Sequence, residues 1–302
     1  MKVYKGFVAD STRWEAFTFR PGDIVISTPS KCGTTWMQRL VALLVFDGPD
    51  LPAPMADVSP WLDMNTRPIH EVIADLEAQT HRRFIKTHTP LDGLPISDDA
   101  TYICVGRDPR DAAVSMAHHM NNMEIEQLIT LRAEAVGLDD VPPDAEVPDR
   151  SLDDLPGKLR RWIDAPAGNT DGMESLATIL HHFDTFFAES RRPNVHLFHY
   201  SDLRADLPGQ LHRLADALGV ELITERAVEL AAEGSIEAMR ARAGDFAPNA
   251  TQSLWKDTAR FFRSGTGGEW QELMTAADQR HYTERVTELT SPEVARWAHA
   301  GH

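Results

Sequence analysis

The chain is poor in cysteine and has no long apolar run. Its 302 residues include only two cysteines, Cys32 and Cys104, which argues against a disulfide-stabilised secreted scaffold and favours a reducing compartment, the cytoplasm. No stretch is long and apolar enough to cross a membrane, so we expect no integral membrane association. Residues 1–6 also lack the apolar core of a signal peptide.

Positive charge is scarce as well. The chain has 30 lysines and arginines against 46 aspartates and glutamates, a formal net charge of −16. A nucleic acid would be repelled by this charge, and the sequence has no basic stripe to bind one, so we expect no nucleic-acid partner. With 42% hydrophobic and 25% charged residues, the chain is predicted to form a single domain over residues 1–302.

Apolar strand-like segments alternate with amphipathic helical segments along the chain. Residues 102–106 form a near-continuous apolar run, and residues 176–187 and 211–218 carry apolar side chains at helical spacing. This pattern predicts an α/β fold with a central parallel sheet flanked by helices. Residues 138–156 are acidic and rich in proline, and they predict a surface excursion or lid within residues 121–172.

The most informative segment is a predicted phosphate-binding turn. The apolar run at residues 23–27 leads into Lys31-Cys32-Gly33-Thr34-Thr35 and then a helix. Backbone N–H groups at a helix N-terminus attract phosphate, and a glycine lets the backbone approach it closely. Lysine adds charge, threonine adds hydroxyl donors, and Trp36 offers a flat face for an adenine ring. A plain strand-turn-helix junction capped by threonine is the alternative interpretation.

This turn differs from the usual nucleoside-triphosphate loop. Its lysine precedes the glycine and no Gly-Lys pair follows, which disfavours a standard ATPase or kinase. Residues 19–36 instead resemble the cofactor loop of the cytosolic-type sulfotransferases, here a bacterial-like member. Those enzymes use 3′-phosphoadenosine 5′-phosphosulfate (PAPS), and their fold resembles that of P-loop nucleoside triphosphatases. The resemblance implies cofactor contacts from each residue of positions 31–36, with Cys32 acting through its backbone N–H.

A second motif is Lys86-Thr87-His88-Thr89-Pro90-Leu91, at the end of a short predicted strand. Ligands of α/β folds bind at that end of the strands, and histidine is suited to accept a proton near neutral pH. A lone histidine there is more often structural. The match to the family implies that His88 is the general base and that Lys31 and Lys86 neutralise charge on the transferred group.

Three further segments complete the resemblance, in the order along the chain that the family requires. Arg107 and Ser115 match the residues that hold the 3′-phosphate, which ATP lacks, and the family also implies that Ser115 restrains Lys31. Tyr200 matches a tyrosine near the adenine. Residues 261–270 match a glycine-rich loop that closes over the 3′-phosphate, which implies contacts from Arg263, Ser264 and Gly265. Without the family, an exposed Arg-Asp pair, a buried tyrosine and a flexible loop are the alternatives.

The resemblance implies transfer of a sulfuryl group from PAPS to a hydroxyl, or less readily an amine, of a small acceptor, without a metal and with release of adenosine 3′,5′-bisphosphate (PAP). A nucleotide kinase with an atypical loop and a non-catalytic nucleotide-binding protein are the alternatives. Several large side chains predict an apolar or aromatic acceptor, with core packing as the other interpretation; they are Trp61, Met64, Met116, Met120 and Trp162.

Two departures from the family pattern lead to expectations of their own. Cys32 stands where the family usually has serine, and its position beside Lys31 and a helix N-terminus predicts a lowered thiol pKa and a site that oxidation can block. Residues 271–280 lack the dimerisation motif of many animal members, so we do not expect that dimer.

Overall fold

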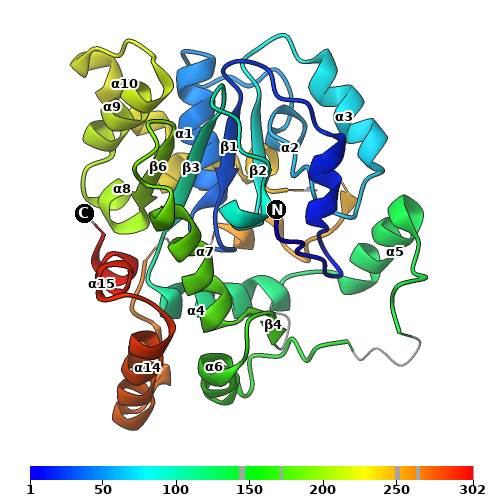
Figure 1. Ribbon diagram of the computed structural model, residues 1–302, viewed down its shortest axis with the longest axis vertical. Coiled ribbons are helices and arrows are strands. Elements are labelled where there is room, and N and C mark those ends of the chain that lie inside the picture. The colour runs from blue at the N-terminus through cyan, green and yellow to red at the C-terminus, as the bar shows by residue number, and fades with distance from the viewer. Residues whose placement is uncertain (143–146, 171–172, 249–251, 263–265, 302) are drawn as a thin grey trace.

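The computed structural model describes residues 1–142, 147–170, 173–248, 252–262 and 266–301. Its centre is a four-stranded parallel sheet in the order β2-β1-β3-β6. The strands are β1 (Ile24–Ser27), β2 (Phe84–Thr87), β3 (Thr101–Gly106) and β6 (Val195–His199). Figure 1 shows helices on both sides of this sheet, which confirms the predicted α/β fold.

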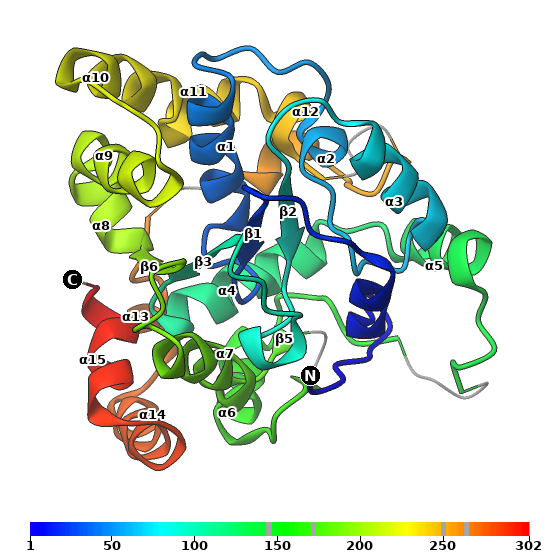
Figure 2. The same cartoon turned by 45° about the horizontal axis from the view of Figure 1, so that its top comes forward.

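Alternate strand residues enter two separate apolar cores, because successive side chains in a strand point to opposite faces. Val25 and Tyr102 belong to one core, which is packed by α4 (Pro109–Asn121), α6 (Leu155–Asp164), α7 (Leu176–Ala188), α14 (Ala276–Leu289) and α15 (Pro292–Ala300). Ile24 and Ile103 belong to the other core, which is packed by α1 (Thr34–Val45), α9 (Leu207–Leu218) and α10 (Thr224–Glu233). Figure 2 shows these two groups of helices on opposite sides of the sheet. Since both faces are covered, β3 is apolar over most of its length, as its sequence indicated.

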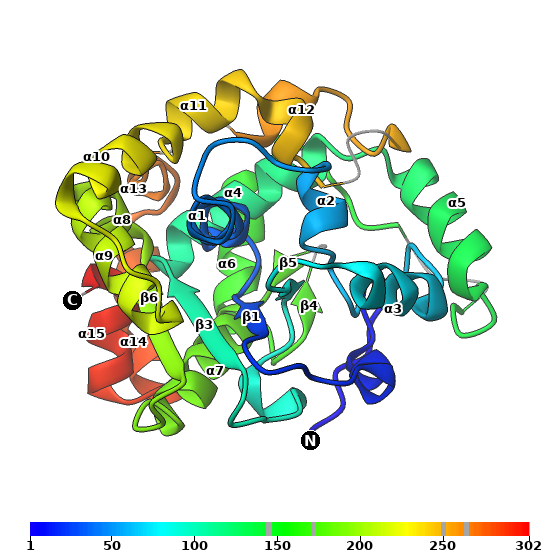
Figure 3. The same cartoon turned by 90° about the horizontal axis from the view of Figure 1, so that it is seen from above.

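The helices of ten or more residues are α1 (Thr34–Val45), α3 (Ile69–Ala78), α4 (Pro109–Asn121), α5 (Ile125–Val136), α6 (Leu155–Asp164), α7 (Leu176–Ala188), α9 (Leu207–Leu218), α10 (Thr224–Glu233) and α14 (Ala276–Leu289). The shorter ones are α2 (Met55–Val58), α8 (Tyr200–Ala205), α11 (Ile236–Ala241), α12 (Ala243–Phe246), α13 (Trp270–Leu273) and α15 (Pro292–Ala300), with 3₁₀ turns η1 (Ser11–Ala16), η2 (Leu91–Gly93) and η4 (Thr258–Phe261). Figure 3 shows α10, α11 and α12 as a curved row beside α1.

Local capping sets several helix boundaries. Asp108 accepts a hydrogen bond from the backbone of Arg110 and so starts α4, with proline at its first position. Thr275 and Asp278 form a reciprocal capping box at the start of α14. Helix α9 ends before Gly219, whose φ of 65° suits glycine.

The segment predicted to be a surface excursion or lid divides into two kinds of structure. Helix α5 stands apart from the sheet, next to the N-terminal segment (Figure 1). Helix α6 instead buries Leu155, Leu159 and Trp162 in the core shared with α7. The short hairpin β4 (Asn169–Thr170) and β5 (Met173–Glu174) then leads into α7. Within the described residues of 121–172, α5 therefore lies apart from the sheet, whereas α6 is part of the core.

In the part of the chain that the structure describes, we find no helix that combines the length and the apolar character needed to span a bilayer.

Candidate active site

Each of the four parallel strands is followed directly by a predicted functional segment. The phosphate-binding turn follows β1, His88 follows β2, Arg107 follows β3 and Tyr200 follows β6. Because the strands are parallel, their carboxyl ends meet at one edge of the sheet, where α/β folds bind ligands. The topology therefore gathers four segments that are far apart in the sequence.

The turn between β1 and α1 depends on two residues with positive φ. Lys31 has a φ of 65° and Gly33 a φ of 112°, which favours glycine. A Cβ atom at Gly33 would lie 3.2 Å from the Tyr200 ring, so glycine also makes room for that ring. The first-turn N–H groups of α1 have no acceptor within the helix and lie at the positive end of its dipole. The turn thus has the form of an anion-binding site.

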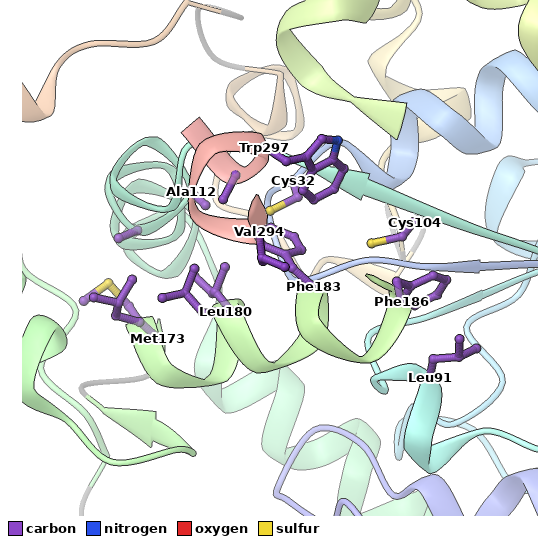
Figure 4. Close-up of a cluster of buried hydrophobic side chains, with 14 of the residues drawn as sticks. Cys32, Leu91, Cys104, Ala112, Met173, Leu180, Phe183, Phe186, Val294 and Trp297 are labelled. Carbon is purple, nitrogen blue, oxygen red and sulfur yellow. The ribbon is translucent and has the colours of Figure 1, made fainter. Parts of the chain in front are cut away.

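The structure contradicts the expectation for the Cys32 thiol. Cys32 is completely buried in the core beneath the turn, in the cluster that contains Cys104 and Trp297 (Figure 4). Burial raises the pKa of the Cys32 thiol, an effect larger than the opposing one of nearby Arg107. The predicted lowered pKa is therefore wrong, and the reason given for a redox-sensitive site no longer holds. The Cys32 amide donates a 3.3 Å hydrogen bond to Pro29 O within the turn.

His88 is held in a defined tautomer. Its Nδ1 lies 2.7 Å from Thr28 O, and because a carbonyl oxygen only accepts, Nδ1 carries the proton. The lone pair is thus on Nε2. The ring meets the Trp61 ring edge-to-face, with 4.6 Å between centroids. Burial, and then the charge of Lys86, holds the His88 pKa well below its usual value, so the imidazole is neutral at neutral pH and its Nε2 lone pair can accept a proton.

Lys86 is a buried cation next to His88. It is buried at the end of β2, and its Nζ lies 4.6 Å from the centroid of the Trp61 ring. Burial lowers the pKa of Lys86 to about 8, against the opposing effect of Asp63. Asp63 is itself completely buried and accepts hydrogen bonds from Thr87 and Thr89, both at 2.6 Å. This carboxylate therefore orders the strand end that carries Lys86 and His88.

Arg107 joins the phosphate-binding turn to the C-terminal segment. Its Nη1 donates to Lys31 O at 3.0 Å and its Nη2 reaches Thr266 O at 3.5 Å. The guanidinium carbon lies 4.6 Å from the centroid of the Tyr200 ring. Nε is buried without a hydrogen-bond partner among the described residues. A buried guanidinium with an unused donor is suited to an anionic ligand.

The C-terminal segment is docked on α4 by polar contacts. Gly268 N donates to Asp111 at 2.7 Å, and His118 Nε2 lies 2.9 Å from Glu269. Glu269 and Gly268 thus both contact side chains of α4. Three predicted cofactor residues of this segment fall outside the described residues; they are Arg263, Ser264 and Gly265.

Lys31 contacts a residue to which the sequence gave no catalytic role. Its Nζ lies 3.2 Å from His119 Nδ1 and 4.6 Å from the centroid of the Phe261 ring. His119 is one helical turn after Ser115 on α4, so both side chains face the same side. The tandem pair His118-His119 thus divides between the docked C-terminal segment and the cavity.

One cavity of about 1180 Å³ is lined by Lys31, Lys86, His88, Arg107 and His119. Every predicted site residue in the described part of the chain lines it, except Cys32. Its polar wall holds Lys31, Lys86, His88, Arg107 and Ser115, with the turn residues Gly33, Thr34, Thr35 and Trp36 and with Tyr200. Its apolar wall comes from the N-terminal segment, α4, α5 and the segment before η4; it includes Phe7, Val8, Met64, Met116, Met120, Met123, Leu128, Ile129, Leu254 and Trp255.

The large side chains predicted to border the acceptor had mixed outcomes. Trp61, Met64, Met116 and Met120 line the cavity. The prediction that Trp162 borders the acceptor is wrong, because Trp162 is fully buried in the core. Its Nε1 donates a 2.7 Å hydrogen bond to Glu174 O.

Sequence reasoning missed Asp63 and Glu174 at this end of the sheet, and it left His119 at the helix surface or the pocket rim. His119 and Glu174 line the cavity, and Asp63 lies behind Lys86. Glu174 accepts hydrogen bonds from Ser30 N at 2.9 Å and Ser30 Oγ at 2.8 Å, and burial raises its pKa. Only His119 carried a usable signal, its i, i+4 spacing from Ser115. Among the described residues, no group of three or more histidine, cysteine or acidic side chains is arranged to hold a metal ion.

Comparison with known proteins gives consistent matches across the chain. The family described as the sulfotransferase domain matches residues 21–294. A glycolipid sulfotransferase of Mycobacterium bovis (strain BCG / Pasteur 1173P2) is 49% identical, over 99% of this chain and 94% of that protein. Among solved structures, mouse sulfotransferase SULT7A1 complexed with PAP has a TM-score of 0.69 at 21% identity, over 95% of this chain and 92% of that one. Retinol dehydratase in a complex with retinol and PAP has a TM-score of 0.68 at 21% identity, covering 94% and 87%.

Proposed function

The chain belongs to the sulfotransferase family, and from this premise we propose that it transfers a sulfuryl group from PAPS to a hydroxyl group of a glycolipid-like acceptor. The observation that carries the proposal is the single cavity that joins the phosphate-binding turn, Arg107 and His88 to an apolar wall. We treat residues 1–302 as one domain, with α5 as the roof of this cavity.

The donor would be held by the turn and by Arg107. The first-turn amides of α1, with Thr34 and Thr35, would bind the 5′-phosphate. Arg107, with its unused buried Nε, and Ser115 would bind the 3′-phosphate. Trp36 and Tyr200, whose rings pack edge-to-face with 5.2 Å between centroids, would contact the adenine. Arg263, Ser264 and Gly265 stay predictions for the 3′-phosphate. Cys32 remains only as a backbone contact.

The chemical step is an in-line displacement. His88 Nε2 removes the proton of the acceptor hydroxyl as its oxygen bonds to sulfur. The bond from sulfur to the 5′-phosphate oxygen breaks, and PAP leaves with that electron pair. Lys31 and Lys86 stabilise the charge that develops on the bridging and sulfuryl oxygens. A sulfuryl group carries less negative charge than a phosphoryl group, so the two lysines can serve where phosphoryl transfer commonly uses magnesium.

The walls of the cavity favour an amphipathic acceptor. Its volume of about 1180 Å³ exceeds the range of about 300–1,000 Å³ typical of a single small-ligand site, so there is room for donor and acceptor together. Methionine side chains on α4 are adaptable and suit a flexible apolar chain. The 49% identical relative is a glycolipid sulfotransferase, which supports the same class. A hydroxylated head near His88 and an apolar tail along α4 and α5 fit these walls.

The two alternatives predict different results. A nucleotide kinase would turn over ATP with magnesium, and a non-catalytic protein would bind PAP without transfer. The chain's place in the sulfotransferase family disfavours both. The direct test is incubation of the protein with ³⁵S-labelled PAPS and a panel of glycolipids, alcohols, phenols and amines. Labelled glycolipid is the expected product, and magnesium-dependent ATP turnover without sulfuryl transfer would overturn the proposal.

Replacement of Arg107 should weaken PAP binding selectively. We expect Arg107→Ala to cost about 1.5–3 kcal/mol in PAP affinity, typical of hydrogen bonds to charged groups, measured by titration calorimetry. Affinity for ADP, which has no 3′-phosphate, should change much less. Arg107→Lys keeps the charge but loses the forked geometry, so its loss should be intermediate. Arg204→Ala, an exposed arginine on α8, is the control. Equal losses for PAP and ADP would contradict the 3′-phosphate role.

A further inference from the structure

The cavity has a polar recess that the proposed step does not use. We define the recess by four residues that line the cavity where the β4–β5 hairpin meets the phosphate-binding turn; they are Ser30, Gly168, Glu174 and Thr178. Hydrogen bonds connect them, because Ser30 donates to Glu174 and Thr178 Oγ1 accepts from Gly168 N at 2.6 Å. Ser175, which follows Glu174, has its Oγ 3.0 Å from Thr178 Oγ1. The four residues therefore form one continuous polar surface.

The carboxyl group of Glu174 is the ionisable group of this recess. Ser30 N donates to one of its oxygens at 2.9 Å, and Ser30 Oγ lies 2.8 Å from the other. A carboxylate offers about four acceptor positions, so about two are left for a ligand. Among the described residues, no cation contributes to the pKa of this carboxyl group. A partly buried carboxylate without a cation is costly, which favours a ligand that donates hydrogen bonds to it.

The core holds Glu174 in place from behind. Its carbonyl oxygen accepts a 2.7 Å hydrogen bond from Trp162 Nε1, and Trp162 is fully buried. The preceding residue, Met173, is buried in the same core. The backbone of Glu174 is thus fixed by the core, and its carboxylate is fixed by Ser30. A group that is to select a ligand needs such a fixed position.

The recess lies close to the proposed base. Ser30, which binds the carboxylate, comes two residues after Thr28, whose carbonyl oxygen holds His88 Nδ1. Two residues of extended chain span at most about 7 Å, so the carboxylate and the imidazole are held by two points of one short segment. Glu174 and His88 both line the cavity. An acceptor whose reacting hydroxyl group is at His88 therefore has the rest of its head near Glu174.

We propose that the Glu174 carboxylate binds a second hydroxyl group of the acceptor and so selects a sugar head over a simple alcohol. The proposal rests on the proposed function and names a further contact of the same site. The reacting hydroxyl group faces His88, the second one donates to Glu174, and the apolar tail lies along α4 and α5. An alcohol without the second hydroxyl group leaves the acceptor positions of Glu174 unused, and this difference gives the selectivity.

Two uncharged acceptors with the same tail provide the test. Octyl glucoside has several hydroxyl groups in its head and n-octanol has one, and both are used below the concentration at which micelles form. The measured quantity is kcat/KM for octyl glucoside divided by kcat/KM for n-octanol. Glu174→Gln removes the charge, but its amide oxygen can accept from Ser30 N and its amide nitrogen can donate to Ser30 Oγ. Glu284→Gln, the same change at an exposed position of α14, is the control.

We expect Glu174→Gln to lower this ratio about tenfold, a factor within the range expected for a hydrogen bond to a charged group. The value of kcat/KM for n-octanol should hardly change, and Glu284→Gln should have the ratio of the unsubstituted enzyme. An unchanged ratio in Glu174→Gln overturns the inference. An equal loss for both acceptors also overturns it, because Glu174 would then act only by holding the turn at Ser30.

A binding measurement distinguishes failure of this inference from failure of the proposed function. Octyl glucoside is titrated by calorimetry into the complex of the protein with PAP, where no transfer can occur. We expect the Kd to be about tenfold weaker in Glu174→Gln than in the unsubstituted protein. If this difference is found but PAPS gives no sulfuryl transfer to any acceptor, the proposed function fails and the contact with Glu174 stands. Equal Kd values in the two proteins overturn the inference.

A measurement on the unsubstituted protein covers the case in which Glu174→Gln does not fold. Deoxy analogues of octyl glucoside, each without one hydroxyl group of the sugar, are titrated into the same complex with PAP. We expect the analogue that lacks the hydroxyl group bound by Glu174 to bind about tenfold more weakly than octyl glucoside. If every analogue binds as tightly as octyl glucoside, no hydroxyl group of the head contacts the carboxylate and the inference is overturned.

Discussion

His88→Ala should lower turnover by about 10²- to 10⁴-fold, the usual contribution of a positioned general base. The fixed tautomer of His88 is the reason: Thr28 O holds the proton on Nδ1, so Nε2 is the basic atom. PAP affinity should hardly change, because no donor contact is assigned to this imidazole. Steady-state kinetics with saturating acceptor, and PAP titration by calorimetry, provide the two measurements.

A second variant tests whether basicity or shape matters at this position. In His88→Asn the side-chain amide can still donate to Thr28 O but has no basic nitrogen, so its turnover should be as low as that of His88→Ala. His70→Ala, an exposed histidine on α3, is the control. Turnover within threefold of the unsubstituted enzyme in His88→Asn would remove His88 from the role of base.

Much of this site could be predicted because the fold places strand ends together. Each predicted segment is short, but His88, Arg107 and Tyr200 each come directly after a strand of one parallel sheet. An apolar strand-like segment followed by a polar residue can be recognised in the sequence. Parallel pairing of the strands then brings their carboxyl ends to one edge of the sheet. The family itself was predicted from the motifs and is confirmed by the match over residues 21–294.

The direction in which each side chain of the β1–α1 turn points could not be predicted from the sequence. Cys32 lies between Lys31 and Gly33, both with positive φ, and this backbone path turns its thiol into the core. Neighbouring residues in the sequence suggested an electropositive surface thiol. The tertiary structure instead surrounds it with apolar atoms, and burial raises its pKa. Only the backbone angles distinguish the two outcomes.

The apolar wall of the cavity could be predicted in part, because some of its residues lie on a helix that carries a motif residue. Met116 and Met120 are spaced i, i+4 on α4, the helix that carries Ser115. The predicted role of Ser115 therefore indicated that these two methionines lie near the site. Phe7 and Leu128 carry no such signal, because they come from the N-terminal segment and α5, which meet only in the tertiary structure. Arg132 joins them: it donates to Phe7 O at 2.9 Å and to Asp140 at 2.6 Å. Contacts of this kind have no local sequence pattern.

Lys86→Met should lower turnover by about 10²- to 10³-fold, as expected when one group that stabilises developing charge is removed. The same residue should set the alkaline limit of activity. Burial lowers the Lys86 pKa to about 8, so the ammonium form is lost as pH rises through that value. His88, whose pKa is held well below its usual value, is already neutral at pH 6.5. We therefore expect kcat/KM to be level just above pH 6.5 and to fall near pH 8.

Lys86→Arg separates the charge of this residue from its pKa. An arginine stays charged throughout the alkaline range, so any activity that this variant retains should no longer fall near pH 8. Because the ammonium group lies against Trp61 in a buried position, the larger guanidinium should fit less well and turnover should be reduced. A fall near pH 8 that persists in Lys86→Arg would assign the alkaline limit to another group. Lys86→Met with unreduced turnover would contradict charge stabilisation by Lys86, leaving that task to Lys31 alone.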